Sequence, residues 1–131
     1  MASLSLDWHG DFKFSSSAGM PPISLDSSNP DAPSPMQALA YGAMACMAMD
    51  VVLILQKGRH DLKGLKVKFD GTRAEDHPKR YTRIHLIFEL TGAVPMEAVE
   101  RALALSREKY CSVSNSLRSD IDFTTSFTLT E

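Results

Sequence analysis

The sequence has few cysteines, and their spacing does not match a zinc site. Only two occur among 131 residues, Cys46 and Cys111. No Cys-x-x-Cys or His-x-x-x-His pair is present, so we expect no bound metal and no cofactor. The N-terminus has neither the basic start nor the apolar stretch of a signal peptide. We therefore expect a cytoplasmic protein in which both thiols are reduced.

The chain also lacks an excess of charge of either sign. Lysine and arginine number 14 against 16 aspartate and glutamate residues, which gives a formal net charge of -2. A nearly neutral chain lacks the basic surface that binds nucleic acid or an anionic membrane, so neither is an expected partner. Glycine-rich phosphate loops and Gly-x-Ser-x-Gly turns are absent as well. The two thiols remain as the candidates for chemistry.

The apolar pattern predicts one domain, residues 1–131, that combines strands and helices. Alternating apolar side chains predict short strands near the N-terminus, and His9-Gly10-Asp11 is expected to turn the first strand into the second. Further strands are predicted at residues 64–70, 80–91 and 122–130, and helices at residues 35–57, 95–109 and 111–118.

The longest predicted helix begins at a clear signal and is apolar on nearly all sides. Ser34 is the expected N-cap, Pro35 the first helical residue, and Gln37 completes a capping box. Residues 38–55 are long enough to raise the question of a membrane span, but Asp50 and the many small residues favour a buried helix. Such a helix must be covered by a sheet and by either a second helix layer or a second subunit. A homodimer is the more economical prediction.

The local sequence predicts different environments for the two thiols. Cys46 lies in the apolar helix, where a buried core cysteine is the simplest interpretation, and Asp50 one turn later would raise the Cys46 pKa if ionised. Cys111 precedes a predicted short helix whose free N–H groups favour a thiolate. Local reasoning therefore predicts that Cys111 is the more acidic thiol. Asp50 itself could equally be a buried carboxylate bonded to nearby donors.

Two segments of the sequence are distinctive. Residues 34–57 run from Ser-Pro-Met-Gln through Cys-Met-Ala-Met-Asp-Val-Val, and residues 105–113 contain Glu-Lys-Tyr-Cys-Ser-Val. Together they resemble the OsmC/Ohr family, the osmotically inducible and organic-hydroperoxide-resistance proteins. The resemblance implies an α+β fold in which antiparallel sheets pack on a long central helix. It also implies an intertwined homodimer with its active sites at the subunit interface.

The resemblance also implies a chemistry for the thiols. Cys46 would attack a hydroperoxide and become a sulfenic acid, and Cys111 would resolve it as a disulfide. An external dithiol, such as a lipoyl group, would then reduce the disulfide, and the protein would act in oxidative-stress defence. This assignment reverses the ranking of the two thiols that the local sequence predicts.

Two departures from the family pattern leave an alternative open. Family peroxidases carry a glutamate near the start of the central helix, which orients an arginine against the thiolate, whereas this chain has Gln37. No arginine precedes Arg59, so Lys13, or Arg80 or Arg83 of the partner subunit, would have to supply the charge. Asp50 is a candidate to orient that cation. The alternative function is a non-catalytic stress or small-ligand-binding dimer, with an apolar ligand and a redox-sensitive dithiol.

Overall fold

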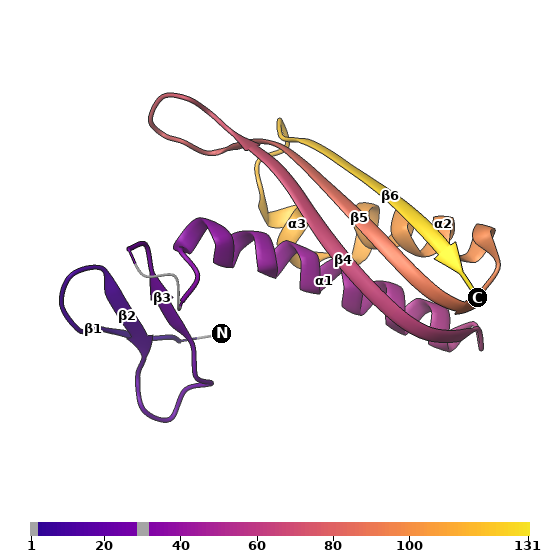
Figure 1. The fold of residues 1–131 in the computed structure, drawn as a ribbon, viewed down its shortest axis with the longest axis horizontal. Coiled ribbons are helices and arrows are strands. Elements are labelled where there is room, and N and C mark those ends of the chain that lie inside the picture. Colours follow the sequence, from indigo (N-terminus) through magenta and orange to yellow (C-terminus); the bar gives the residue numbers. More distant parts are fainter. Residues whose placement is uncertain (1–2, 29–31) are drawn as a thin grey trace. The chain divides into compact units, whose positions relative to one another are not determined.

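The computed structural model describes residues 3–28 and 32–131. The chain divides into two compact units, Met1–Tyr41 and Gly42–Glu131, and the prediction of a single domain stays a prediction. In chain order the elements of the described residues are β1 (Leu6–Trp8), β2 (Lys13–Ser16), β3 (Ser24–Asp26), α1 (Pro35–Lys57), β4 (Asp61–Arg73), β5 (Tyr81–Ala93), α2 (Met96–Leu105), the π-helical turn η1 (Ser106–Tyr110), α3 (Ser112–Ser116) and β6 (Asp122–Thr130) (Figure 1).

The first unit contains a small antiparallel sheet in the order β1-β2-β3. Its first hairpin turns at Gly10 and Asp11, whose φ angles are 97° and 47°, and the predicted turn is confirmed. Most large apolar side chains of the sheet are exposed, among them Trp8 and Phe12 at 67% and 63%. A sheet of three short strands cannot cover its own apolar face, so this surface needs another layer.

Helix α1 begins and ends where the sequence predicts. The Ser34 N–H donates to Gln37 Oε1 at 3.0 Å, and the Gln37 N–H donates to Ser34 Oγ at 3.2 Å, which is the expected capping box. At the other end Arg59 takes the left-handed conformation, with φ of 59°, and the His60 N–H donates to the Leu55 carbonyl at 3.0 Å. This second arrangement satisfies carbonyls that the helix end leaves free.

The second unit is built on the sheet β4-β5-β6, and one pairing in it differs from the prediction. Strands β4 and β5 are antiparallel, as expected, but β5 and β6 are parallel. The expectation of antiparallel sheets was therefore wrong for this pair, while the α+β fold class is confirmed. The physical reason is the connection: α2, η1 and α3 all lie between β5 and β6, and such a crossover returns the chain in its original direction.

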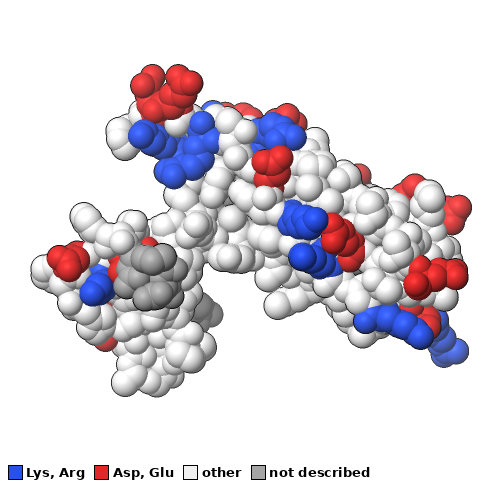
Figure 2. All heavy atoms as spheres, in the orientation of Figure 1, with Lys and Arg blue, Asp and Glu red and all other residues white. Residues whose placement is uncertain are grey.

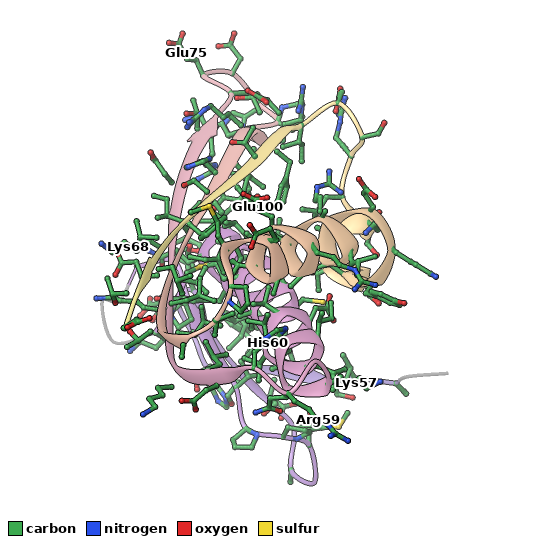
Figure 3. All side chains as sticks on the ribbon, turned by 90° about the vertical axis from the view of Figure 1, so that its right-hand side faces the viewer. Lys57, Arg59, His60, Lys68, Glu75 and Glu100 are labelled. Carbon is green, nitrogen blue, oxygen red and sulfur yellow. The ribbon has the colours of Figure 1, made fainter. Side chains whose placement is uncertain are left out.

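The core of this unit lies between the sheet and its helices, which Figures 1 and 3 show on one side of the sheet. Strand β5 turns alternate side chains inward, as predicted, and Ile84, Leu86, Phe88 and Leu90 are almost fully buried. A matching buried stripe on α1 has a spacing of four residues and consists of Ala43, Met47, Val51 and Leu55. The outer surface of the sheet carries mixed charges, and Figure 2 shows basic and acidic side chains interspersed on the face in view.

The single chain covers only part of α1. Tyr41, Met49 and Leu53 are 61%, 70% and 52% exposed, although the sequence predicts that this helix is covered on all sides. By length and composition α1 is apolar enough to cross a membrane, and only 28% of its most apolar window is buried within the chain. Such a helix is weak evidence for a membrane span, because the core helix of a soluble protein has the same composition. The exposed apolar side chains show that a single chain does not bury the whole surface of α1.

Gly92 on β5 provides a test of the strand geometry. Its φ is 137°, and a Cβ atom there would lie 2.1 Å from the Asp61 carbonyl oxygen. We therefore expect Gly92→Ala to lower the free energy of unfolding by about 2 kcal/mol or more, measured by urea denaturation. Gly64→Ala is the matched control, because a Cβ there meets Thr91 only at 3.4 Å. Equal stabilities of the two variants would contradict this account.

Candidate functional site

The structure brings the two cysteines together although 65 positions separate them in the sequence (111 minus 46). Cys46 is half-buried and Cys111 is fully buried, and neither forms a disulfide. The two thiols are close enough to interact, because the Cys46 side chain raises the pKa of Cys111. The chain therefore contains a dithiol in which the two sulfur atoms are direct neighbours.

Small residues on α1 allow the backbone near Cys111 to approach the helix. Cys46 lies near the middle of α1, and Gly42 precedes it by one turn. A Cβ atom built on Gly42 would lie 3.8 Å from Val113 Cγ1, which is van der Waals contact. A side chain longer than alanine in place of Gly42 would therefore meet Val113, which lies two residues after Cys111.

Local hydrogen bonds fix Cys111 at the junction of η1 and α3. Its N–H donates to the Ser106 carbonyl at 2.7 Å, and its carbonyl accepts from Asn115 Nδ2 at 2.8 Å. Its sulfur accepts from the Ser114 N–H at 3.3 Å and so caps α3. The sequence predicts one helix over residues 95–109, but the α-helical part ends at Leu105 and the wider turn η1 follows.

The environment of Cys111 raises the pKa of its thiol. Burial is the largest cause, and the neighbouring Cys46 adds to it, because a negative charge there would oppose a second thiolate. The hydrogen bonds from Ser114 act in the opposite direction. Burial therefore outweighs the acidifying effect that the sequence predicts for the N-terminus of α3. That prediction considered the N-terminus of α3 but could not include the complete burial of the sulfur.

The other two predicted site residues have separate partners. Ser106 Oγ donates to Asp50 Oδ2 at 2.8 Å, so this half-buried carboxylate has the nearby donor that the sequence left as an alternative. Gln37 lies nine residues before Cys46, about 14 Å along the helix axis. Its carboxamide oxygen accepts from Ser34 N–H, and its structural role is the cap of α1.

Among the residues that the structure describes, no lysine or arginine contributes to the shifted pKa of Cys111. Lys13 is an exposed residue of β2. Arg80 pairs with Asp120 at 3.7 Å, and Arg107 stacks over the ring of Phe123 at 4.5 Å. In the same described residues, no group of three or more histidine, cysteine, aspartate or glutamate side chains is placed to hold a metal ion.

A hollow of about 440 Å³ opens beside Asp50, between the end of α1 and α2. Apolar side chains form much of its wall, together with the polar groups of Lys57, Arg101 and Tyr110. Figure 3 shows Lys57 at the C-terminal end of α1. Sequence reasoning missed these three residues and Ser106. Two of them could have been found from their positions in the sequence. Lys57 ends the helix that carries Cys46, and Tyr110 directly precedes Cys111.

The contact between the thiols makes a prediction about titration. Replacing Cys46 by alanine removes its effect on its neighbour, so we expect the pKa of Cys111 to fall in Cys46→Ala. The pH dependence of the ultraviolet absorbance of the thiolate would measure the Cys111 pKa in the folded protein. Met47→Leu, which changes a buried neighbour without a thiol, is the control. An unchanged midpoint for Cys111 in Cys46→Ala would show that the two sulfur atoms do not interact.

Comparisons with known proteins identify the family. The sequence profile described as OsmC-like protein matches residues 28–126. Protein YhfA of Escherichia coli K12 is 44% identical over 107 residues, which cover 80% of this chain and 80% of that protein. A hypothetical protein from Aquifex aeolicus VF5 has a solved structure that is similar over 100% of this chain and 98% of its own, with 30% identity and a TM-score of 0.91.

A third comparison concerns the fold alone. The crystal structure of an organic hydroperoxide resistance protein OsmC from Legionella pneumophila covers 98% of both chains with a TM-score of 0.73, at 20% identity. This fold agrees with the matched profile and with the YhfA relative, and those two matches confirm the resemblance that the sequence suggested. The chain described here belongs to the OsmC-like protein family.

Proposed function

We propose that this protein is a cysteine-based hydroperoxide reductase that acts in oxidative-stress defence, with Cys46 as the attacking thiol and Cys111 as the resolving thiol. The direct contact between the two sulfur atoms is the observation that supports it most. Solved structures of the same fold named as organic hydroperoxide resistance proteins support the class of reaction. Gln37 and Asp50 are then supporting residues: the first caps α1, and the second contacts the segment before Cys111.

The proposed reaction has two steps on the protein. The Cys46 thiolate attacks the distal oxygen of a hydroperoxide, the O–O bond breaks, and the alkoxide takes up a proton and leaves as the alcohol. The Cys111 sulfur then attacks the Cys46 sulfenic acid, so that the S–S bond forms while the S–O bond breaks and water leaves. An external dithiol, for which a lipoyl group is a candidate, would reduce the disulfide.

Burial supports this assignment of the two roles. Cys46 is partly accessible, whereas Cys111 has no exposed surface, so a peroxide reaches Cys46 first. Burial raises the pKa of Cys111, so its protonated thiol is the poorer nucleophile toward a peroxide. The accessible thiol is therefore the one assigned to the first step.

A homodimer would supply what the single chain lacks. One face of α1 carries exposed apolar and small side chains around a shallow hollow, formed by Ala45, Ala48, Met49, Val52, Leu53 and Gln56. Alanines on such a face allow a second helix to approach closely. Cys46 follows Ala45 at the edge of this face. A second copy packed there would lie beside the thiol, where it could place the cation that activates a peroxidatic cysteine.

The peroxidase proposal predicts a defined loss of thiols. After one equivalent of cumene hydroperoxide, we expect both thiols of the reduced protein to disappear within seconds as an intramolecular disulfide. Cys46→Ser should abolish the loss, and Cys111→Ser should leave a sulfenic acid that dimedone labels. A thiol count with mass spectrometry measures all three results. Thiols that survive minutes of exposure in the unaltered protein would reject this reaction for organic hydroperoxides.

The dimer proposal predicts the mass of the particle in solution. We expect sedimentation equilibrium to give twice the 14.4 kDa of one chain. Leu53→Lys should shift the particle toward a monomer, because it places a charge on the exposed apolar face of α1. Met96→Lys is the matched control, since Met96 is 57% exposed but lies on α2. A dimer that persists equally in both variants would show that this face of α1 is not the interface.

The second candidate function is a cytoplasmic dimer that binds a small ligand and uses its dithiol only as a redox sensor. Two observations favour it: among the described residues no basic side chain contributes to the shifted pKa of Cys111, and a hollow of about 440 Å³ lies beside Asp50. An activated thiolate needs such a cation, whereas a binding site does not. The thiol count separates the two candidates, because a sensor would oxidise slowly and would not turn over with an excess of dithiol.

A further inference from the structure

We infer that Asp50 and Ser106 form a positioning pair that holds Cys111 against Cys46, so that the resolving step depends on their hydrogen bond. The inference deepens the proposed function and rests on it for its biological meaning. Neither residue touches the reacting peroxide in this account. Their effect is exerted through the backbone of η1, the turn that ends directly before Cys111.

Ser106 connects α1 with the backbone of Cys111. Its hydroxyl donates to Asp50 Oδ2 at 2.8 Å, and its carbonyl accepts from the Cys111 N–H at 2.7 Å. The side chain has no exposed surface, so water does not compete for the hydroxyl. A hydrogen bond to a carboxylate is stronger than one between neutral groups. Ser106 therefore makes two links. Its hydroxyl connects the start of η1 to α1, and its carbonyl holds the backbone of Cys111 at the end of η1.

The π-helical geometry of η1 is less common than an α-helix, so a hydrogen bond that stabilises it matters for the position of Cys111. In an α-helix the Ser106 carbonyl would accept from the N–H four residues later, that of Tyr110. Here it accepts from Cys111, five residues later, so one more residue fits into the turn. In a regular α-helix each residue is rotated by about 100° from the one before it, so the extra residue in the turn changes the direction in which Cys111 leaves it. Turns of this kind are rare and are frequently found at functional sites, and the Asp50 contact stabilises this one.

The positions on α1 match the two partners. Asp50 follows Cys46 by four residues and so lies on the same side of the helix, one turn further along. The thiol contact and the Asp50–Ser106 hydrogen bond are therefore neighbouring links between the same two segments. A disulfide requires Cα atoms within about 4.4–6.8 Å. Loss of one link would loosen the other, whereas the exposure of Cys46 to a reagent would not change.

The test separates the access to Cys46 from the approach of Cys111 and needs no peroxide. With 5,5'-dithiobis(2-nitrobenzoate) in excess, Cys46 forms a mixed disulfide and releases one thionitrobenzoate. The Cys111 thiolate then attacks the Cys46 sulfur, the protein disulfide forms, and a second thionitrobenzoate leaves. The first kinetic phase measures access to Cys46, and the second measures the approach of Cys111. Both are followed by absorbance on the full-length protein.

We expect Ser106→Ala to slow the second phase by about tenfold to a hundredfold and to leave the first unchanged, since small misplacements of reacting atoms have effects of this size. Asp50→Ala should do the same, and the double variant should be no slower than either single one. Asp50→Asn keeps an oxygen that can accept from Ser106, so it should retain more of the rate. Ser112→Ala, which removes an exposed hydroxyl from α3, is the matched control.

Several results would overturn the positioning role. A second phase within twofold of the unaltered protein in Ser106→Ala would do so, as would equal slowing of both phases in Asp50→Asn, which keeps the shape of the side chain. Independent, additive effects of the two substitutions would also contradict a shared hydrogen bond. Failure of the peroxidase proposal would show instead in the thiol count with cumene hydroperoxide, while the two-phase kinetics of the dithiol would remain as described.

Discussion

The site depends on the close packing of α1 against the segment that carries Cys111. Two thiols that are far apart in the sequence can touch only if both backbones approach to within the reach of two short side chains. Gly42, next to Val113, provides the space on α1. The hydrogen bonds around Cys111 hold the other side in place. Burial of Cys111 in this contact raises its pKa, so packing and reactivity have a common origin.

Much of the fold could be predicted because it follows from local patterns. The capping box at Ser34 and Gln37 located the start of α1, and the last predicted strand, residues 122–130, has the same bounds as β6. The alternation in β5 identified its buried face. Each of these features involves residues a few positions apart, whose hydrogen bonds and burial are determined within one element.

The features that the sequence did not reveal are set by distant parts of the chain. The parallel pairing of β5 and β6 depends on the path of the crossover, and alternation is the same in parallel and antiparallel strands. The turn η1 has the apolar pattern of a continuing helix, so its extra residue was invisible. The acidity of Cys111 was predicted from α3 alone, whereas the burial of its sulfur and the neighbouring Cys46 of α1 raise its pKa. The family resemblance supplied the pairing of the cysteines, which local physics could not.

The parallel crossover also has a consequence for how the molecule acquires its chemistry during folding. Cys111 lies within the connection between β5 and β6, so its place beside α1 is part of closing that long loop. Loop closure carries an entropic cost before any distant contact forms, and parallel pairings of this kind form slowly. The dithiol is therefore assembled only when this long loop closes. Earlier on the pathway the cysteines are separate thiols, so the ability to form the disulfide distinguishes a finished molecule from an unfinished one.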